Sequence, residues 1–320
     1  MGFRVENPGI QTTIQDEGRF GYQQYGVSVS GPMDTESFCI ANILVGNSGS
    51  DAGLEITYMG PTLVFDEDNV IAVTGGHLSP MLNGELMPMY RAVKVKSGDR
   101  LVFGGAGSNG CRAYVAFAGG LDVPEVMGSR ATLLRNSIGG IDGRKLEKGD
   151  EVKFLSPKSE LADMDKRAVL PREYPKKEVV LRVIPGPQDD RFTEDELRKF
   201  FWYSAEICNE SDRMGYRLKR EIPVKHKTDG NIITDGIAFG SIQVPSDGQP
   251  IIMMADRQST GGYTKIGTVI TVDLPKLAQA MPGYRVRFVR VGIDLAQQLY
   301  LRRQKWLEDL DREINGKAEQ

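Results

Sequence analysis

The sequence has few of the residues that build metal centres and disulfide frameworks. Among 320 residues there are three cysteines and two histidines. Cys39, Cys111 and Cys208 stand far apart without Cys-x-x-Cys spacing, so we expect no disulfide framework, and Cys111 is expected to be a small buried residue. His77 is expected to be a satisfied structural residue and His226, between two lysines, to be exposed. Neither has a second histidine at ligand spacing, and no metal site is predicted.

Long apolar segments and a strong net charge are also absent. No run of about 18 apolar residues occurs, and the first residues, MGFRVENPGIQTT, lack the apolar centre of a signal peptide. Forty Lys and Arg nearly balance 43 Asp and Glu, which leaves a net charge of −3. Because so small a charge attracts neither nucleic acid nor a membrane surface, we expect small molecules or proteins as partners. A cytoplasmic location is expected by default.

Glycine, in contrast, is abundant, with 37 residues scattered without a period. Short β-branched stretches such as 70–74 and 112–118 lie between turn residues. Apolar and polar positions alternate after Gly98, Gly149 and Gly283, which is a hairpin pattern. The sequence therefore predicts a mainly β architecture with a few short capping helices.

The helices have recognisable start signals. Asp34 precedes an apolar segment that ends at Gly46, and Thr193 with Glu196 forms a capping box that opens a helix over 194–203. Asp273 precedes an apolar stripe that stops at a Pro-Gly pair. A polar helix over 294–314 carries five apolar residues on one side, which are Leu295, Leu299, Trp306, Leu310 and Ile314. This helix is expected to pack on its own chain or to serve assembly.

A charged connection divides the chain. The segment 156–178 holds eleven charged residues and three prolines, a composition typical of a solvated link. We predict one β-barrel domain over 1–165, a second over 178–292, and a C-terminal helix or tail over 293–320. The related pentapeptides NPGIQ and IPGPQ, one in each half, indicate two related modules.

Two loops of the first half could carry chemistry. Residues 12–22 place Asp16 and Arg19 on a glycine-cornered turn, where they either contact a ligand or brace the turn. Residues 30–34 lead into the first helix, whose N-terminus could hold an anion or be capped by Asp34.

Two further loops lie in the second half. Residues 211–217 carry Arg213, Tyr216 and Arg217, which could hold a carboxylate or phosphate through bidentate hydrogen bonds or form a structural network. Residues 255–265 follow a buried strand and combine a glycine pair with groups able to move protons. A solvated turn is the alternative for this loop. Neither a P-loop nor a G-x-S-x-G elbow occurs.

Taken together, these segments resemble the biotin-dependent carboxyltransferase family from Val5 to Val291. The matching strings are PGIQTTIQDEGRFGYQQYGVSVSGPMD, LEITYMGPTLVF, GSRATLLRNSIGG, IPGPQDDRFT, SDRMGYRL, SIQVPSDGQPIIMMADRQSTGGYTKIGTVI and DLPKLAQAMPGYRVRF. Members of this family include allophanate hydrolase subunit 2, the C subunit of 5-oxoprolinase, the carboxyltransferase part of urea carboxylases, and an antagonist of a sporulation-kinase inhibitor.

The resemblance implies two cyclophilin-like β-barrels and a partner, subunit 1 of the same family. The expected function is that of an enzyme subunit that, with subunit 1 and a third lactam-utilisation protein, opens the lactam ring of 5-oxoproline using ATP and Mg bound by the complex. A second reading is carboxyl transfer to a urea-like or amide acceptor, with carboxybiotin supplied by a separate carrier protein and no cofactor attached to this chain. A third is a non-catalytic antagonist of a histidine-kinase inhibitor.

The loops already singled out supply the candidate residues. For proton exchange the resemblance implies catalytic roles for Asp256, Tyr263 and Lys265. The expected substrate-binding residues are Arg213, Tyr216, Arg217, Arg257, Gln258, Gly261, Gly262, Asp16, Arg19, Met33 and Asp34. The arginines would hold a carboxylate in carboxyl transfer and phosphate in lactam opening.

Overall fold

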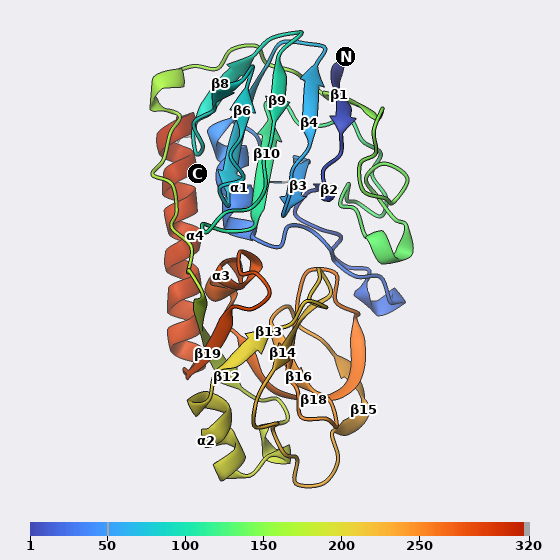
Figure 1. Ribbon diagram of the computed structural model, residues 1–320, viewed down its shortest axis with the longest axis vertical. Coiled ribbons are helices and arrows are strands. Elements are labelled where there is room, and N and C mark those ends of the chain that lie inside the picture. Colours follow the sequence, from blue (N-terminus) through green and yellow to red (C-terminus); the bar gives the residue numbers. More distant parts are fainter. Residues whose placement is uncertain (50, 317–320) are drawn as a thin grey trace. The chain divides into compact units, whose positions relative to one another are not determined.

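The chain forms two compact units, which are described here from a computed structural model covering residues 1–49 and 51–316. Unit 1 consists of Met1–Arg19, Ser30–Tyr174 and Gln304–Gln320. Unit 2 consists of Phe20–Val29 and Pro175–Arg303 (Figure 1). The short segment before the first helix thus belongs to the second unit.

Unit 1 consists mainly of two antiparallel sheets. Its elements are β1 (Gly2–Asn7), β2 (Gln11–Gln15), α1 (Thr35–Leu44), β3 (Gly53–Thr57), β4 (Thr62–Phe65), β5 (Asn69–Gly75), β6 (Met81–Leu82), β7 (Glu85–Leu86), β8 (Ala92–Val95), β9 (Arg100–Val102), β10 (Arg112–Phe117) and β11 (Glu151–Lys153). One sheet has the order β11-β1-β4-β9-β6-β7 and the other β2-β3-β10-β5-β8. Both contribute to a single apolar core, in which the rings of Phe3 and Phe117 stack with centroids 5.0 Å apart.

Helix α1 begins where the sequence predicts. The Asp34 carboxylate accepts a hydrogen bond from the Ser37 backbone N–H at 3.0 Å, which satisfies one of the free donors of the first turn. The apolar residues of α1 are buried in a second core of unit 1, together with residues of β5 and β10.

Unit 2 is built around a closed barrel. Its elements are β12 (Glu178–Pro185), α2 (Glu194–Trp202), β13 (Ala205–Ile207), β14 (Gly215–Lys219), β15 (Asn231–Gly236), β16 (Ser241–Val244), β17 (Ile251–Met253), β18 (Thr260–Val269), α3 (Leu274–Ala278) and β19 (Arg285–Arg290). The first part of α4 (Ile293–Asn315) also belongs to unit 2, whereas its residues from Gln304 onward belong to unit 1. Within the described residues the strand order is β12-β19-β13-β14-β17-β16-β18-β15, and an additional pairing of β12 with β18 closes the ring. Strand β15 lies outside that ring, on β18. The predicted mainly β class is confirmed.

Helix α2 is fixed at both ends. The Thr193 hydroxyl accepts the Glu196 N–H at 3.2 Å, as the capping box predicts, while the Glu196 carboxylate binds the Lys225 N–H instead of closing the box. At the other end the Arg220 guanidinium donates to the carbonyls of Lys199 and Phe200. Burial lowers the pKa of Arg220 to about 10, so the group stays charged at neutral pH.

Helix α4 is confirmed, but the predicted apolar side is partly wrong. Leu307, Leu310 and Ile314 are buried in the core of unit 1 that also holds α1. Leu295 and Trp306 are each 44% exposed. The buried stripe has the spacing i, i+3, i+7 and begins only at Leu307, so Trp306 falls beside it rather than on it. No helix among the described residues combines the length and the apolar character needed to cross a membrane.

Helix α3 begins directly after Asp273, as the sequence predicts, but the Asp273 side chain makes no capping hydrogen bond. Its side chain, which is fully buried, accepts two hydrogen bonds from Arg182, with Nε–Oδ2 at 2.8 Å and the second terminal nitrogen 2.7 Å from Oδ1. Lys276 adds a contact of 2.7 Å. Burial opposes ionisation, yet these hydrogen bonds keep the pKa of Asp273 below its usual value. The carboxylate therefore ties β12 to α3.

We expect Asp273→Asn to lower the free energy of unfolding by about 3–5 kcal/mol at pH 7, because it leaves a partly buried guanidinium without its charged partner. Because folding lowers the pKa of Asp273, its ion pair stabilises the protein fully at a pH above the pKa of Asp273 in the unfolded chain. This stabilisation is lost as the pH falls through the pKa of Asp273 in the folded protein. Urea unfolding should show the gap to wild type closing below about pH 4. An equal gap at pH 3 and pH 7 would contradict the assignment, and Lys276→Met, which removes only the more exposed partner, is the control.

Candidate functional site

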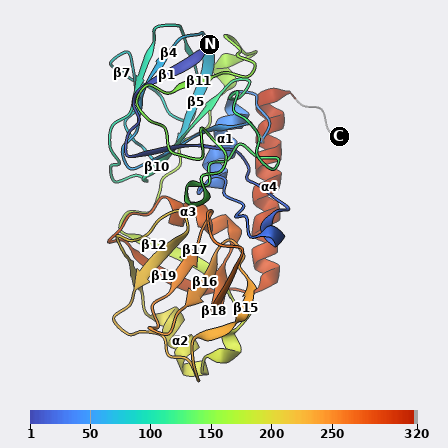
Figure 2. The same ribbon diagram turned by 90° about the vertical axis from the view of Figure 1, so that its right-hand side faces the viewer.

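A group of charged and amide side chains in unit 2 surrounds the first half of β18. It consists of Gln188, Asp235, Gln243, Gln258, Gly261 and Lys265, here called the Lys265 cluster. Strand β18 runs between β15 and β16, with Gly261 opposite Asp235 and Lys265 opposite Gln243. Figures 1 and 2 show these three strands side by side.

Lys265 is the central charge of the cluster. Its side chain is only 2% exposed, and Nζ donates to Asp235 Oδ2 at 2.7 Å. Gln188 braces both partners: its Oε1 accepts the Lys265 backbone N–H at 3.0 Å, and its Nε2 donates to Asp235 Oδ2 at 3.2 Å. The hydrogen bond from Lys265 is the main reason that the pKa of Asp235 is lowered. The buried amino group of Lys265 thus lies against a carboxylate that is 51% exposed.

Amide groups complete the cluster. Gln243 is 1% exposed, and its Nε2 has no hydrogen-bond partner among the described residues. A β-carbon added to Gly261 would lie 2.8 Å from Gln243 Nε2 and 3.5 Å from Gln258 Nε2. The side-chain amides of Gln243 and Gln258 therefore both lie next to Gly261, the glycine at which the sequence predicts close approach of a ligand to the backbone. An ammonium and amide donors at one place fit an oxygen atom of a carboxylate or a carbonyl group.

Arg213 and Asp256 are engaged with each other. They form a bidentate ion pair with both N–O distances at 3.0 Å, and both side chains are buried. The Asp256 N–H also donates to the Arg213 carbonyl, which joins the two loops. The pair uses Nε and one terminal nitrogen of Arg213 and both oxygens of Asp256, so the expected roles of Asp256 as a proton carrier and Arg213 as a ligand anchor stay predictions that compete with this contact.

Arg257 is also held by the protein. Its guanidinium donates to the carbonyls of Ile237 and Met254, and it lies over the ring of Phe239 with 5.4 Å to the centroid. Burial lowers its pKa to about 10. The Ser28 hydroxyl, from the short segment of unit 2, donates to the Arg257 carbonyl at 2.7 Å. The Arg257 guanidinium therefore stabilises its own loop, and substrate binding by Arg257 stays a prediction.

The other residues predicted in unit 2 separate into two groups. Tyr216 is buried and its hydroxyl lies 3.3 Å from the Ala280 carbonyl, whereas Arg217, the next residue of β14, is exposed on the opposite face. One ligand on one face of β14 cannot contact both side chains. Tyr263 is half-exposed and Gly262 partly exposed, and both lie on β18 next to the Lys265 cluster.

In unit 1, Asp16 and Arg19 brace a loop rather than pair with each other. Asp16 accepts hydrogen bonds from the Ser129 hydroxyl at 2.6 Å and from the Arg130 N–H. Arg19, fully buried, donates to the carbonyls of Val126 and Ala131. Asp16 and Arg19 therefore stabilise the turn, which is one of the two roles that the sequence predicts. They do so through hydrogen bonds to the loop over 126–131.

Met33 and Asp34 are both fully buried, so the structure contradicts their expected contact with substrate. Besides capping α1, Asp34 Oδ2 accepts hydrogen bonds from the hydroxyls of Ser37 and Tyr174. The Met33 N–H donates to the Glu55 carboxylate at 2.7 Å. These contacts use the polar atoms that a ligand would need.

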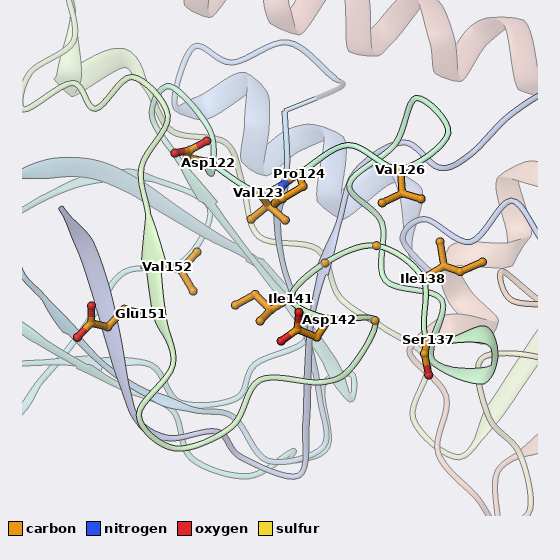
Figure 3. A pocket seen from close by; sticks show the side chains of 13 residues that line it. Asp122, Val123, Pro124, Val126, Ser137, Ile138, Ile141, Asp142, Glu151 and Val152 are labelled. Atoms are coloured by element: carbon orange, nitrogen blue, oxygen red, sulfur yellow. The ribbon is translucent and has the colours of Figure 1, made fainter.

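Unit 1 contains a cavity of about 610 Å³ that the sequence does not predict. It lies among the loops 122–126 and 137–143 and strand β11. Figure 3 shows Val152 and Ile141 pointing toward one another across it, with Asp142 beside Ile141. Asp122, Asp142 and Glu151, all exposed, are the charged residues of its lining. An acidic rim of this kind does not match the anionic ligands expected from the sequence.

The two histidines exchange the roles predicted for them. His77 is exposed, whereas His226 is partly buried, with Nε2 2.9 Å from Thr264 Oγ1 and 3.1 Å from the Val244 carbonyl. Its ring packs on Phe192 at 4.8 Å. Burial lowers the pKa of His226, which favours the neutral imidazole. The lysines on either side of His226 in the sequence suggest exposure, but the His226 ring contacts Thr264, Val244 and Phe192. Cys111 is buried as predicted, and burial raises the pKa of its thiol.

Comparison with known proteins decides the family. Residues 25–290 match the carboxyltransferase domain, subdomains A and B. The chain belongs to this family. It is 36% identical to the C subunit of 5-oxoprolinase from Escherichia coli (strain K12), over 96% of this chain and 97% of that protein. It is 34% identical to the urea amidolyase of Lachancea kluyveri, over 93% of this chain but 17% of that protein. The crystal structure of the K. lactis urea amidolyase matches with a TM-score of 0.88 at 34% identity, covering 97% of this chain and 20% of that one.

Sequence reasoning missed three members of the Lys265 cluster in this carboxyltransferase-family chain. Gln188 and Asp235 are 77 and 30 positions from Lys265, and Gln243 joins them through the pairing of β16 with β18. The one usable signal was Gln243 itself, a polar residue within the buried strand Ser241–Val244. A buried amide in such a strand needs a partner, and that need marks a site.

Gly261→Ala and Gly262→Ala form a matched pair that tests how tightly the cluster is packed. At Gly261 the new methyl group would lie 2.7 Å from Ile237 Cδ1 and 2.8 Å from Gln243 Nε2, whereas at Gly262 the nearest atom is 3.4 Å away. We expect Gly261→Ala to cost about 1–3 kcal/mol in urea unfolding and Gly262→Ala to be tolerated. Equal stability of the two variants would show that Gln243 does not lie against Gly261.

Proposed function

We infer that this chain is the C subunit of a 5-oxoprolinase, which opens the lactam ring of 5-oxoproline with consumption of ATP in a complex with companion subunits. The observation that carries this is coverage in both directions. The chain spans 97% of two proteins named as the C subunit of 5-oxoprolinase, at 36% and 34% identity, but only 17% of the urea amidolyases it resembles.

The partners and the compartment follow from the same proposal. A protein named as the C subunit of an enzyme works with other subunits, and we propose subunit 1 of the same family and a third lactam-utilisation protein as those of this chain. ATP with Mg would be bound by the complex, and because the reaction uses ATP we expect it to occur in the cytoplasm. The regions 1–165 and 178–292 would be the two carboxyltransferase subdomains, with 293–320 as an accessory helix and tail.

The Lys265 cluster is the proposed reaction site. Lys265 would stabilise the negative charge that develops on the lactam oxygen when the ring opens, since it is charged, buried and held by Asp235. Tyr263, half-exposed beside it on β18, would exchange a proton with the leaving nitrogen. Gln258 would contact the substrate, Gly261 would let the Gln243 amide lie against the backbone, and Gly262 would leave room for the substrate. The Arg213–Asp256 pair would hold the loop that precedes β18.

Carboxyl transfer is the second candidate, favoured by the 34% identity and the TM-score of 0.88 to the urea amidolyase. In that case carboxybiotin carried by another protein would supply the carboxyl group. The donor set fits this group as well, because Lys265 and the amides could hold its carboxylate oxygens. The two candidates differ in acceptor and in the need for ATP, so one assay separates them.

The decisive assay uses the purified chain combined with its companion subunits, ATP, Mg and 5-oxoproline. We expect release of glutamate, and a loss of at least about 100-fold in kcat for Lys265→Met, because a charge that stabilises the transition state is removed. Lys227→Met, which removes an ammonium bound to the Asp190 carbonyl in the same unit, is the control and should keep full activity. Consumption of carboxybiotin in place of 5-oxoproline would establish the second candidate, and full activity of Lys265→Met would place the reaction elsewhere.

A further inference from the structure

The side chains of Lys265 and Gln243 both extend along β18 toward Gly261. Lys265 Nζ reaches Asp235, which is the register partner of Gly261 rather than of Lys265. Gln243 is the register partner of Lys265, yet its Nε2 lies 2.8 Å from the β-carbon position of Gly261. Both side chains therefore extend along the strand in the same direction, and they converge near Gly261.

The donors at this point exceed the acceptors that the protein supplies. An ammonium group has three N–H donors and a primary amide has two. Lys265 Nζ donates to Asp235, and Gln243 Nε2 has no partner among the described residues, although Gln243 is 1% exposed. Gln258, whose Nε2 lies 3.5 Å from the same β-carbon position, adds further donors.

A fully buried donor without a partner destabilises the folded protein, since it has lost its hydrogen bonds to water. A ligand that accepts this hydrogen bond would remove the penalty. The ligand must supply an oxygen atom, because the unpartnered Nε2 of Gln243 and the Nζ of Lys265 are both donors. It should be anionic, because Lys265 is a buried cation whose countercharge, Asp235, is half-exposed and lies to one side.

We propose that Gln243 is a substrate-binding residue, and that with Lys265 and Gln258 it forms a subsite for the carboxylate of a small cyclic amide acid. The assignment rests on the proposed function for the identity of that acid, since 5-oxoproline carries a carboxylate beside its lactam. The carboxylate accepts a hydrogen bond from Gln243 Nε2 and one from Lys265 Nζ, whose three N–H groups also serve Asp235 and the lactam oxygen. The reaction itself requires no change at Gln243, so its contribution is binding and positioning.

This role makes an unusual prediction about stability. Gln243→Met keeps the length and approximate volume of the side chain but removes the unpartnered amide. We expect the melting temperature of this variant to equal or exceed that of wild type, while its affinity for 5-oxoproline falls by roughly tenfold or more. Removal of a structural glutamine would instead lower the melting temperature.

Gln249→Met is the matched control in the same unit. The Gln249 amide is fully engaged with the backbone of Arg220, whose N–H it accepts at 2.7 Å and to whose carbonyl it donates at 3.3 Å. We expect this variant to have a lower melting temperature and unchanged affinity. Gln243→Met should thus lose affinity without losing stability, whereas Gln249→Met should lose stability without losing affinity.

The test measures dissociation constants by calorimetry for the full chain and for its complex with the companion subunits. The probes are 5-oxoproline, pyrrolidin-2-one, which has the lactam without the carboxylate, and biotin, which has a carboxylate but no lactam. We expect pyrrolidin-2-one to bind wild type at least about tenfold more weakly than 5-oxoproline, and this difference to disappear in Gln243→Met.

The outcomes separate this inference from the proposed function. If Gln243→Met weakens biotin but 5-oxoproline does not bind, the carboxylate subsite stands and the lactam reaction is wrong. If the complex releases glutamate from 5-oxoproline and Gln243→Met has wild-type affinity or a lowered melting temperature without a change in affinity, the subsite is wrong. Failure of both carboxylates to bind the chain and the complex also overturns it.

Discussion

The feature on which the proposed site depends is a buried ammonium group whose charge the protein neutralises only in part. Lys265 lies almost entirely out of water, and its countercharge, Asp235, is half in solvent and braced by Gln188. Burial of an ammonium is costly unless hydrogen bonds and opposite charge compensate it. Strand pairing meets part of this cost, since β15 brings Asp235 to one side of β18, while β16 brings Gln243 to the other. What remains unsatisfied is donor capacity, which gives the site its preference for anionic oxygen.

The other charged pairs of the described chain have structural roles. Asp273 with Arg182, Asp256 with Arg213, and Asp16 with the loop over 126–131 each use their polar atoms on the protein itself. They resemble the Lys265 cluster in residue type and burial, and they differ because their hydrogen-bonding capacity is spent internally. The distinction proposed here therefore rests on the unpartnered amide of Gln243 rather than on charge or burial alone.

The sequence predicted those features that arise from local physics. Turn glycines and period-two alternation indicated a mainly β chain, and the caps at Asp34 and Thr193 start helices as predicted. The loop containing Lys265 was also singled out. The partners of its residues could not be predicted, because the pairing of strands far apart in the sequence brings Gln188 and Asp235 to Lys265 and Arg213 to Asp256. For the same reason Arg213 and Asp256 looked available in the sequence while the fold engages them with each other.

The most direct test of this account observes the side-chain amide resonances of the glutamines by NMR while 5-oxoproline is added to the full-length protein. Loss of a resonance pair in Gln243→Met assigns the amide in question, and Gln249→Met assigns the reference. The account predicts that the Gln243 signals move with saturation while those of Gln249, bound to the Arg220 backbone, stay in place. Unchanged Gln243 signals at a concentration that saturates the enzyme would contradict it.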